Sequence, residues 1–406
     1  MSDVAMPPSQ KGLGFNLATE AIKARTCGRD ELAKALVQAR ERTQKQFDAL
    51  QNALGPEVPV PFQDNLNPFL WEMGHMGWFA DWWIVRNPVR YLGLKCQPDV
   101  QRLASRQSAR GVDADALYNS ATVSHASRWQ LPLPESTELR RDLEHSLQDV
   151  LLALSTAPQT AEGLYFFKLA LFHEDMHAEA AVYMAQSLGI DILLSQGAQT
   201  STAFKTQELK MEQQSWTLGI HVAGLGDSGF VFDNELQGDE VQVDAYDIDS
   251  KAVTWARFLP WVEEVGGAAP PYLQKTTHGW EVKRGQHWQA LNLESPACHI
   301  SYEQALGWCA WAGRRLPTEA EWELAACIHG DFCWGEVWEW TSSPFRPFTG
   351  FRPHPYQDYS LPWFDGRPVL KGAGPGTSPR MRHPKYRNFI EPHRNDIHSG
   401  FRSVRL

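Results

Sequence analysis

The sequence predicts an α+β fold, in which an N-terminal four-helix bundle precedes an irregular domain of mixed helices and short strands. Up to about residue 188, apolar residues recur at helical spacing in four long segments that polar or broken stretches separate. After Trp216, short β-like runs and many Gly and Pro residues replace this periodicity. The chain has 406 residues, which is an ordinary length for two domains.

The four predicted bundle helices cover about residues 19–54, 68–86, 135–155 and 161–188. The second is apolar on nearly all sides, so we expect it at the centre of the bundle. A long polar segment, residues 95–134, joins the second helix to the third and is expected to be an ordered loop.

The C-terminal half is expected to hold short strands and three helices. Predicted strands cover residues 216–220, 241–248, 279–283 and 287–291, and predicted helices cover about 254–265, the segment that follows Ser301 as N-cap, and the segment 317–326. The expected division of the chain is a flexible tail over 1–17, the bundle over 18–196, a linker over 197–214 and the second domain over 215–406.

Composition and charge exclude several classes of partner. The formal net charge is −10, without a basic cluster, which argues against nucleic acid or an anionic membrane as a partner. No run of 18 apolar residues is present, so we expect no membrane span. The six cysteines form no CxxC pair and the first residues lack a signal-peptide pattern, so a cytoplasmic protein with reduced thiols is expected.

Three histidines are candidate metal ligands. His173 and His177 are four residues apart in a predicted helix, so their side chains project from one face, one turn apart. His75 lies in the apolar second helix between Gly74 and Gly77, where a bundle would bring it to face the other two. A surface HxxxH pair and a satisfied core histidine are the alternative interpretations. Zinc, copper, nickel and iron all accept imidazole, so the residue types alone do not choose the metal.

Longer motifs resemble two known families. The segments ISYEQALGWCAWAGRRLPTEAEWELAA, WGEVWEWTSS and GFRSVRL resemble the formylglycine-generating-enzyme (sulfatase-modifying) domain, which has a C-type-lectin-like fold. LWEMGHMGWF and FHEDMHAEA resemble DinB-like metal-binding bundles, and the pairing of the two is similar to the ergothioneine sulfoxide synthase superfamily. Its members are non-heme iron enzymes that use O2 to join a chalcogen nucleophile to the imidazole C2 of hercynine (trimethylhistidine).

This resemblance implies roles for individual residues. The iron ligands of the superfamily match His75, His173 and His177, which implies Fe(II) as cofactor and O2 as co-substrate. Its tyrosine pair matches Tyr356, the implied catalytic residue, and Tyr359, the implied supporting contact. Its hercynine-contacting segment matches YRNFI, which implies substrate contacts for Asn388 and Phe389.

The departures from the superfamily pattern concern the second substrate. An aspartate that binds the amino-acid thiol is Ile390 here, and two carboxylate-binding arginines are Thr122 and His125. A glutamine before the last histidine is Met176. Replacing a bidentate guanidinium by Thr removes a carboxylate-binding group. A neutral, sugar-like nucleophile therefore fits the implied pocket better than an anionic peptide thiol.

We therefore expect O2-dependent C–Se bond formation between hercynine C2 and a selenosugar, giving a selenoxide precursor of selenoneine, as in the selenoneine-forming branch of the superfamily. The alternative is a sulfoxide synthase that uses cysteine, γ-glutamylcysteine or a thiosugar. A formylglycine-generating oxidase is disfavoured because residues 334–406 lack the cysteine pair that such enzymes use for copper. A non-catalytic binding module on the same fold is the remaining alternative.

Overall fold

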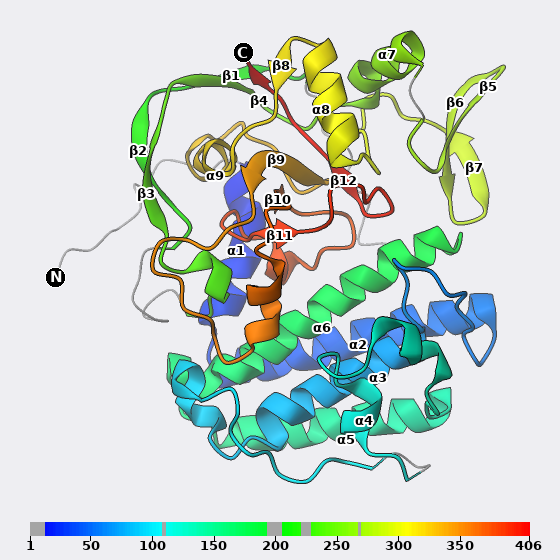
Figure 1. The fold of residues 1–406 in the computed structure, drawn as a ribbon, viewed down its shortest axis with the longest axis vertical. Helices are drawn as coiled ribbons and strands as arrows, with labels where there is room; N and C mark the ends of the chain where they lie inside the picture. Colours follow the sequence, from blue (N-terminus) through cyan, green and yellow to red (C-terminus); the bar gives the residue numbers. More distant parts are fainter. Residues whose placement is uncertain (1–12, 108–110, 193–204, 221–228, 267–268) are drawn as a thin grey trace.

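The computed structural model describes residues 13–107, 111–192, 205–220, 229–266 and 269–406 (Figure 1). A helical region at the N-terminal side is followed by a region of mixed helices and short strands, which confirms the predicted α+β class. No helix in the described ranges is long and apolar enough to cross a lipid bilayer.

Four helices form the bundle in the lower part of Figure 1. They are α2 (Arg29–Leu54), α3 (Phe69–Ala80), α5 (Ser136–Ser155) and α6 (Ala161–Ser187). Both α2 and α3 pack against both α5 and α6, so the four helices enclose one core. Almost every residue of α3 is buried, as its apolar sequence predicts, and the helix continues into a π-helical turn, η1 (Asp81–Val85).

The first predicted helix is wrong in one respect, because residues 19–54 form parts of two helices. Helix α1 (Leu13–Thr26) ends before Gly28, whose extended backbone starts α2. A Cβ at Gly28 would lie 3.0 Å from the Gln159 side chain, so a larger residue would crowd this corner. The predicted flexible tail is therefore too long: residues 13–17 belong to α1, and residues 1–12 lie outside the described ranges.

The long segment between the second and third bundle helices is ordered around short helices: η2 (Arg90–Lys95), α4 (Ala114–Tyr118) and η3 (His125–Gln130). It is fastened to α3 by Asp115, which accepts from Trp78 Nε1 at 2.6 Å and binds both Nη atoms of Arg86. The segment therefore holds Tyr118 against the outside of α3.

The C-terminal region combines small sheets with three helices. One sheet has the order β1 (Glu208–Met211), β4 (Tyr246–Asp249), β13 (Val404–Arg405), β8 (Arg314–Arg315), and another has the order β11 (Asn388–Phe389), β10 (Pro368–Gly372), β9 (Trp338–Pro344), β12 (Ser399–Gly400). The smaller sheets are β2 (Gln214–Leu218) with β3 (Asp239–Val243), and β5 (Leu273–Thr276), β6 (Gly279–Arg284), β7 (His287–Ala290). The helices are α7 (Trp255–Val265), α8 (Tyr302–Trp311) and α9 (Glu319–Ile328).

The predicted linker 197–214 extends too far toward the C-terminus. Its residues 208–211 form β1, whose Leu209 and Met211 are buried where β1 pairs with β4. The polar residues of this strand, Glu208 and Lys210, lie on its exposed face. An alternation of polar and apolar residues over only four positions is too short to predict a strand from sequence. Residues 197–204 lie outside the described ranges.

Helix α6 joins the two regions along one face. Asp175 forms an ion pair with Arg380 at 2.9 Å, and Glu179 accepts from Trp338 Nε1 at 2.7 Å. Helix α1 packs against both α6 and the C-terminal region, where Arg25 pairs with the buried Glu235 at 2.8 Å. The bundle and the sheet region therefore share a polar interface that runs along the helix carrying two of the candidate metal ligands.

Candidate metal centre

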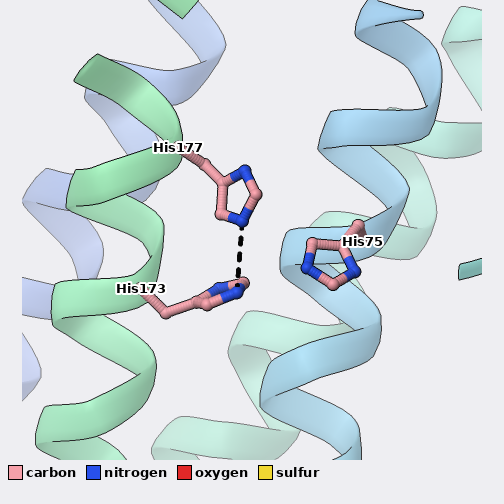
Figure 2. Close-up of side chains that lie close together, drawn as sticks. All are labelled: His75, His173 and His177. Atoms are coloured by element: carbon pink, nitrogen blue, oxygen red, sulfur yellow. Dashed lines mark hydrogen bonds between the residues drawn. The ribbon is translucent and has the colours of Figure 1, made fainter. Parts of the chain in front are cut away.

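The three candidate histidines converge in the middle of the bundle. His173 and His177 project from one face of α6, and His75 projects toward them from α3 (Figure 2). Their candidate ligand atoms all lie within 4.8 Å of one another, and the Nε2 atoms of His173 and His177 are 3.2 Å apart. Imidazole nitrogens of one metal site lie at about 2 Å from the ion, which places them a few ångströms from each other. The arrangement is therefore compatible with one shared ion.

Two hydrogen bonds set the direction in which the rings face. His75 Nδ1 donates to the main-chain carbonyl of Tyr118 at 2.8 Å, and His177 Nδ1 donates to the Glu72 carboxylate. With Nδ1 protonated, the lone pair of each of these rings is on Nε2, the atom that faces the centre. This is the hydrogen-bond pattern that metal-binding histidines use.

Burial keeps two of the three histidines neutral. His75 and His173 are each only 3% exposed. Burial lowers the pKa of His75 to about 3 and that of His173 well below its usual value, with neighbouring histidines adding to the effect. Burial opposes ionisation of Glu72 as well, but His177 outweighs it, and the pKa of Glu72 is lowered. Neutral imidazoles next to an ionised acceptor can bind a cation without first losing protons.

The acidic residues of α6 that lie nearest the histidines in sequence are paired with other side chains. Glu174 is paired with Arg40, Asp175 with Arg380, and Glu179 with Trp338 and Thr377. These side chains leave α6 on other faces than the one that carries the histidines. The acceptor is Glu72, whose spacing of three residues from His75 on an apolar helix is the signal that could have identified it.

Aromatic rings close the sides of the cluster. Phe79 stacks on His173 with ring centroids 3.6 Å apart and an angle of 5° between planes. Trp71 stacks on His75 at 4.8 Å and 10°. Both aromatic residues are almost completely buried, so these walls keep water from two sides of the site.

Of the two candidate tyrosines, Tyr356 lies beside the cluster, and Tyr359 lies next to Tyr356, with ring centroids 6.3 Å apart. The Tyr356 ring meets Phe79 edge-on at 5.0 Å and lies 6.4 Å from the ring of His173. The Tyr359 hydroxyl donates to Tyr386 at 3.1 Å, and Tyr386 donates to the sulfur of Met176 at 3.6 Å. Burial raises the pKa of both Tyr356 and Tyr359, so both hydroxyls stay protonated.

The other predicted contacts divide into two groups. Phe389 meets Tyr359 edge-on at 5.9 Å, and Asn388 and Ile390 are its chain neighbours on and after β11. Thr122 and His125 have other partners: Thr122 donates to the Asn119 carbonyl at an exposed turn. The His125 ring packs on Phe62 and Trp129, and its Nε2 donates to the Leu66 carbonyl at 2.8 Å.

A cavity of about 180 Å³ opens beside Tyr356 and Phe79. It is lined by the following residues: Trp78, Phe79, Trp82, Trp83, Pro98, Asn119, Ser120, Ala121, Pro355, Tyr356, Gln357 and Asp358. Its walls are therefore aromatic on the α3 side and polar on the loop side, with Asp358 as the charged group among the lining residues.

Comparison with known proteins assigns the class of the C-terminal half first. Residues 201–335 match the family model of the sulfatase-modifying factor enzyme 1-like domain. Formylglycine-generating enzyme from Streptomyces coelicolor is 31% identical over 24% of this chain and 41% of its own length. The region that follows the bundle is therefore a domain of the sulfatase-modifying, C-type-lectin-like class.

The more particular similarity spans both halves. Hercynine oxygenase from Mycolicibacterium thermoresistibile is 27% identical over 92% of this chain and 94% of its own length. Hercynine oxygenase from Mycobacterium tuberculosis is 27% identical over 92% of this chain and 98% of its own length. These similarities support the resemblance to the ergothioneine sulfoxide synthase superfamily.

Proposed function

We propose that this protein is an O2-dependent oxidoreductase that joins hercynine, at its imidazole C2, to a selenosugar, with Fe(II) held by His75, His173 and His177. The observation that carries the proposal is the convergence of three imidazoles from two helices next to a buried tyrosine. Similarity to hercynine oxygenases over 92% of the chain supports hercynine as the imidazole substrate.

The proposed reaction balances without a further reductant. The C2–H bond of hercynine and the Se–H bond of the selenosugar break, and a C–Se bond forms. One oxygen atom of O2 ends on selenium as the selenoxide, and the other leaves as water with the two hydrogens. The four electrons that O2 requires come from the two substrates. When bound, the iron supplies the one-electron and O2 chemistry.

The residues of the chain provide orientation, exclusion of water and a proton. Glu72 and the Tyr118 carbonyl orient two of the histidine rings, and Phe79 shields the third. Tyr356 holds a proton on its hydroxyl oxygen, because burial disfavours the phenolate. We assign to Tyr356 the delivery of this proton, and to Tyr359 the support of the same loop through Tyr386.

The cavity beside Tyr356 supports a neutral second substrate. Among its lining residues no guanidinium or ammonium group is present, and Asp358 would repel a carboxylate. Arg86, which stacks on Trp82, is already bound to Asp115. Arg102 lies over Trp82 and Trp83 and donates from Nε and Nη1 to the carbonyls of Trp82 and Val100, while its Nη2 makes no hydrogen bond within the described residues. Aromatic walls with hydroxyl and amide groups on the loop side suit the apolar faces and hydroxyls of a sugar.

An aerobic assay with the purified protein, Fe(II) and hercynine tests this function. Selenoglucose, thioglucose, cysteine and γ-glutamylcysteine are offered in parallel, and the products are identified by mass spectrometry. We expect a hercynine–selenosugar selenoxide as the main product. Exclusive reaction of γ-glutamylcysteine would show that the protein is a thiol-using sulfoxide synthase, and no reaction with any nucleophile would refute the enzymatic function.

A further inference from the structure

The loop that carries Tyr356 and Tyr359 is fastened at both ends by buried polar groups that the proposed chemistry does not use. The loop runs from His354 to Ser360 and includes the short helix η6 (Gln357–Tyr359). Both end residues are buried, and Ser360 is fully so. A buried polar group is costly unless it is paired, so the partners of these two residues decide where the loop lies.

Asp233 binds both ends of the loop from the C-terminal region. It lies at the start of η5 (Asp233–Glu235) and is 2% exposed. One carboxylate oxygen accepts from the Ser360 hydroxyl, and the other accepts from the His354 main-chain N–H at 3.4 Å. Asn234 adds a hydrogen bond from Nδ2 to Ser360 Oγ at 3.1 Å.

Tyr165 binds the loop from the bundle side. Its hydroxyl donates to His354 Nδ1 at 2.9 Å, and both side chains are buried. Burial lowers the pKa of His354 to about 3 and raises that of Tyr165, so a phenol donates to a neutral imidazole. Tyr165 lies on α6, eight residues and about two turns before His173, so this bond ties the loop to the helix that carries two ligands.

Between these two attachments lie Tyr356, to which we assign proton delivery, and Tyr359, to which we assign support of the loop. The Tyr356 ring lies against Phe79 and 6.4 Å from the His173 ring, and the Tyr359 ring stacks on Phe232 at 4.6 Å. Phe232 directly precedes Asp233. The residue that binds the ends of the loop is thus next in sequence to the residue that supports its middle.

We propose that Asp233, together with the Tyr165–His354 hydrogen bond, is a positioning group that fixes Tyr356 relative to the histidine cluster. This inference rests on the proposed function for its catalytic readout, but not for its structural one. Asp233 touches neither a histidine of the cluster nor the cavity lining, so it acts through the loop. Displacement of a reacting group by about 1 Å can cost on the order of 100-fold in rate.

The charge state of Asp233 gives the positioning a pH dependence. Burial raises the pKa of Asp233 to about 6, although the hydrogen bonds that its carboxylate accepts, including the one from Ser360, oppose the shift. The charged and titratable groups around it are Glu235, which pairs with Arg25, and the side chains of Tyr165, His354 and Tyr359. A protonated Asp233 has a donor where it needs an acceptor, so one end of the loop loses its hydrogen bond below about pH 6.

Asp233→Asn tests the inference directly. An amide keeps the size of the side chain but presents N–H to one of the two donors, so the loop should loosen. We expect faster hydrogen exchange of the amides of residues 354–360, a kcat lower by roughly 10- to 100-fold, and unchanged affinity for Fe(II) and hercynine. The wild-type protein should lose kcat below about pH 6, and the variant should lack this acid limb.

Matched variants separate a loss of positioning from a general loss of structure. Asp249→Asn alters another buried carboxylate, which pairs with Arg257 and Ser403 away from the loop, and should leave exchange in 354–360 unchanged. Tyr165→Phe and Ser360→Ala each remove a single hydroxyl and serve if Asp233→Asn does not fold. Both should act in the same direction as Asp233→Asn.

Unchanged exchange in residues 354–360, or an equal loss of kcat in Asp249→Asn, would overturn the positioning role. Failure of the proposed function looks different, because the wild-type protein would then form no hercynine adduct with any nucleophile. In that case the exchange measurement alone still decides whether Asp233 and Tyr165 hold the loop.

Discussion

At the scale of single residues, the site depends on side chains that hold the ligands rather than on the ligands alone. Glu72 and the Tyr118 carbonyl each accept a hydrogen bond from the outer nitrogen of a histidine ring. Such partners fix the ring orientation and raise the basicity of the inner nitrogen, and losing one costs about 10- to 100-fold in metal affinity.

Glu72→Gln should therefore weaken Fe(II) binding by roughly 10- to 100-fold while the fold is retained. Anaerobic titration monitored by calorimetry measures the affinity. Glu179→Gln is the matched control, because Glu179 is a half-buried glutamate near the cluster but pairs with Trp338 and Thr377. Equal losses in both variants would contradict the assignment of Glu72 as the partner of His177.

Tyr356→Phe removes one hydroxyl and leaves the ring that packs on Phe79. We expect Fe(II) and hercynine to bind as in the wild-type protein, and product formation to fall by about 100-fold or more, as is typical when a proton donor is lost. Titration of hercynine and mass spectrometry of products give the two readouts. Wild-type turnover by this variant would remove Tyr356 from the chemistry.

At the scale of elements, helix α3 sets the distance between the bundle and the segment that covers it. A Cβ on Gly74 would lie 2.1 Å from the Tyr118 ring, and the Tyr118 carbonyl accepts from His75. Only a glycine at position 74 leaves room for the Tyr118 ring against α3. The packing at Gly74 is therefore linked to the hydrogen bond that orients the His75 ring.

Gly74→Ala should destabilise the protein by about 1–3 kcal/mol, although the same change in an open helix position is stabilising. It should also weaken Fe(II) binding, because the displaced Tyr118 carries the acceptor of His75 away. Gly77→Ala is the control on the same helix, since its Cβ would lie 3.0 Å from the end of the flexible Leu143 side chain. Chemical denaturation and metal titration distinguish the two; greater stability of Gly74→Ala would contradict the packing argument.

Most of the elements were predictable from sequence, and the failures have physical reasons. Helices α3, α5 and α6 follow from long apolar periodicity, and the capping residue Ser301 from the capping box that it forms with Gln304. The break at Gly28 was missed because a single glycine is tolerated in helices, and the chain turns there for tertiary reasons. Strand β1 was missed because four residues with two polar letters carry little signal.

For the site, too, sequence specifies local spacing but not tertiary contacts. The spacing of His173 and His177 places both on one helix face, which sequence specifies. Which carboxylate binds His177 depends on how α3 is rotated against α6. Tertiary packing sets this rotation, and local sequence does not specify it. The attachment of the tyrosine loop by Asp233 joins residues more than one hundred positions apart, with no local pattern to announce it.

At the scale of the whole molecule, burial of neutral histidines ties stability to pH. Burial lowers the pKa of His354 to about 3 and that of His299 to about 4, and it lowers those of His383 and His398 well below the usual 6.5. The unfolded chain therefore binds more protons than the native protein below pH 6.5. Stability is full above that pH and is lost as the pH falls, by about 1.4 kcal/mol per pH unit for each such histidine.

His299→Asn should make this loss shallower by about 1.4 kcal/mol per pH unit between pH 4 and 6.5. Asparagine suits the position because His299 has a φ of 61°, a left-handed conformation that Asn tolerates. Asp233 acts in the opposite direction, since its pKa is raised, and offsets part of the total. Denaturation curves at several pH values measure the slope, and an unchanged slope in the variant would contradict burial of His299 as a neutral group.

In the proposed site, the metal ligands come from the bundle and the tyrosines from the C-terminal domain. The central claim is that His75, His173 and His177 bind one iron ion at their common centre. Anomalous diffraction at the iron edge from anaerobically loaded crystals tests it most directly. We expect a single peak at coordination distance from the Nε2 atoms of all three histidines, and no such peak in His75→Ala. Iron bound elsewhere, or bound equally well without His75, would contradict it.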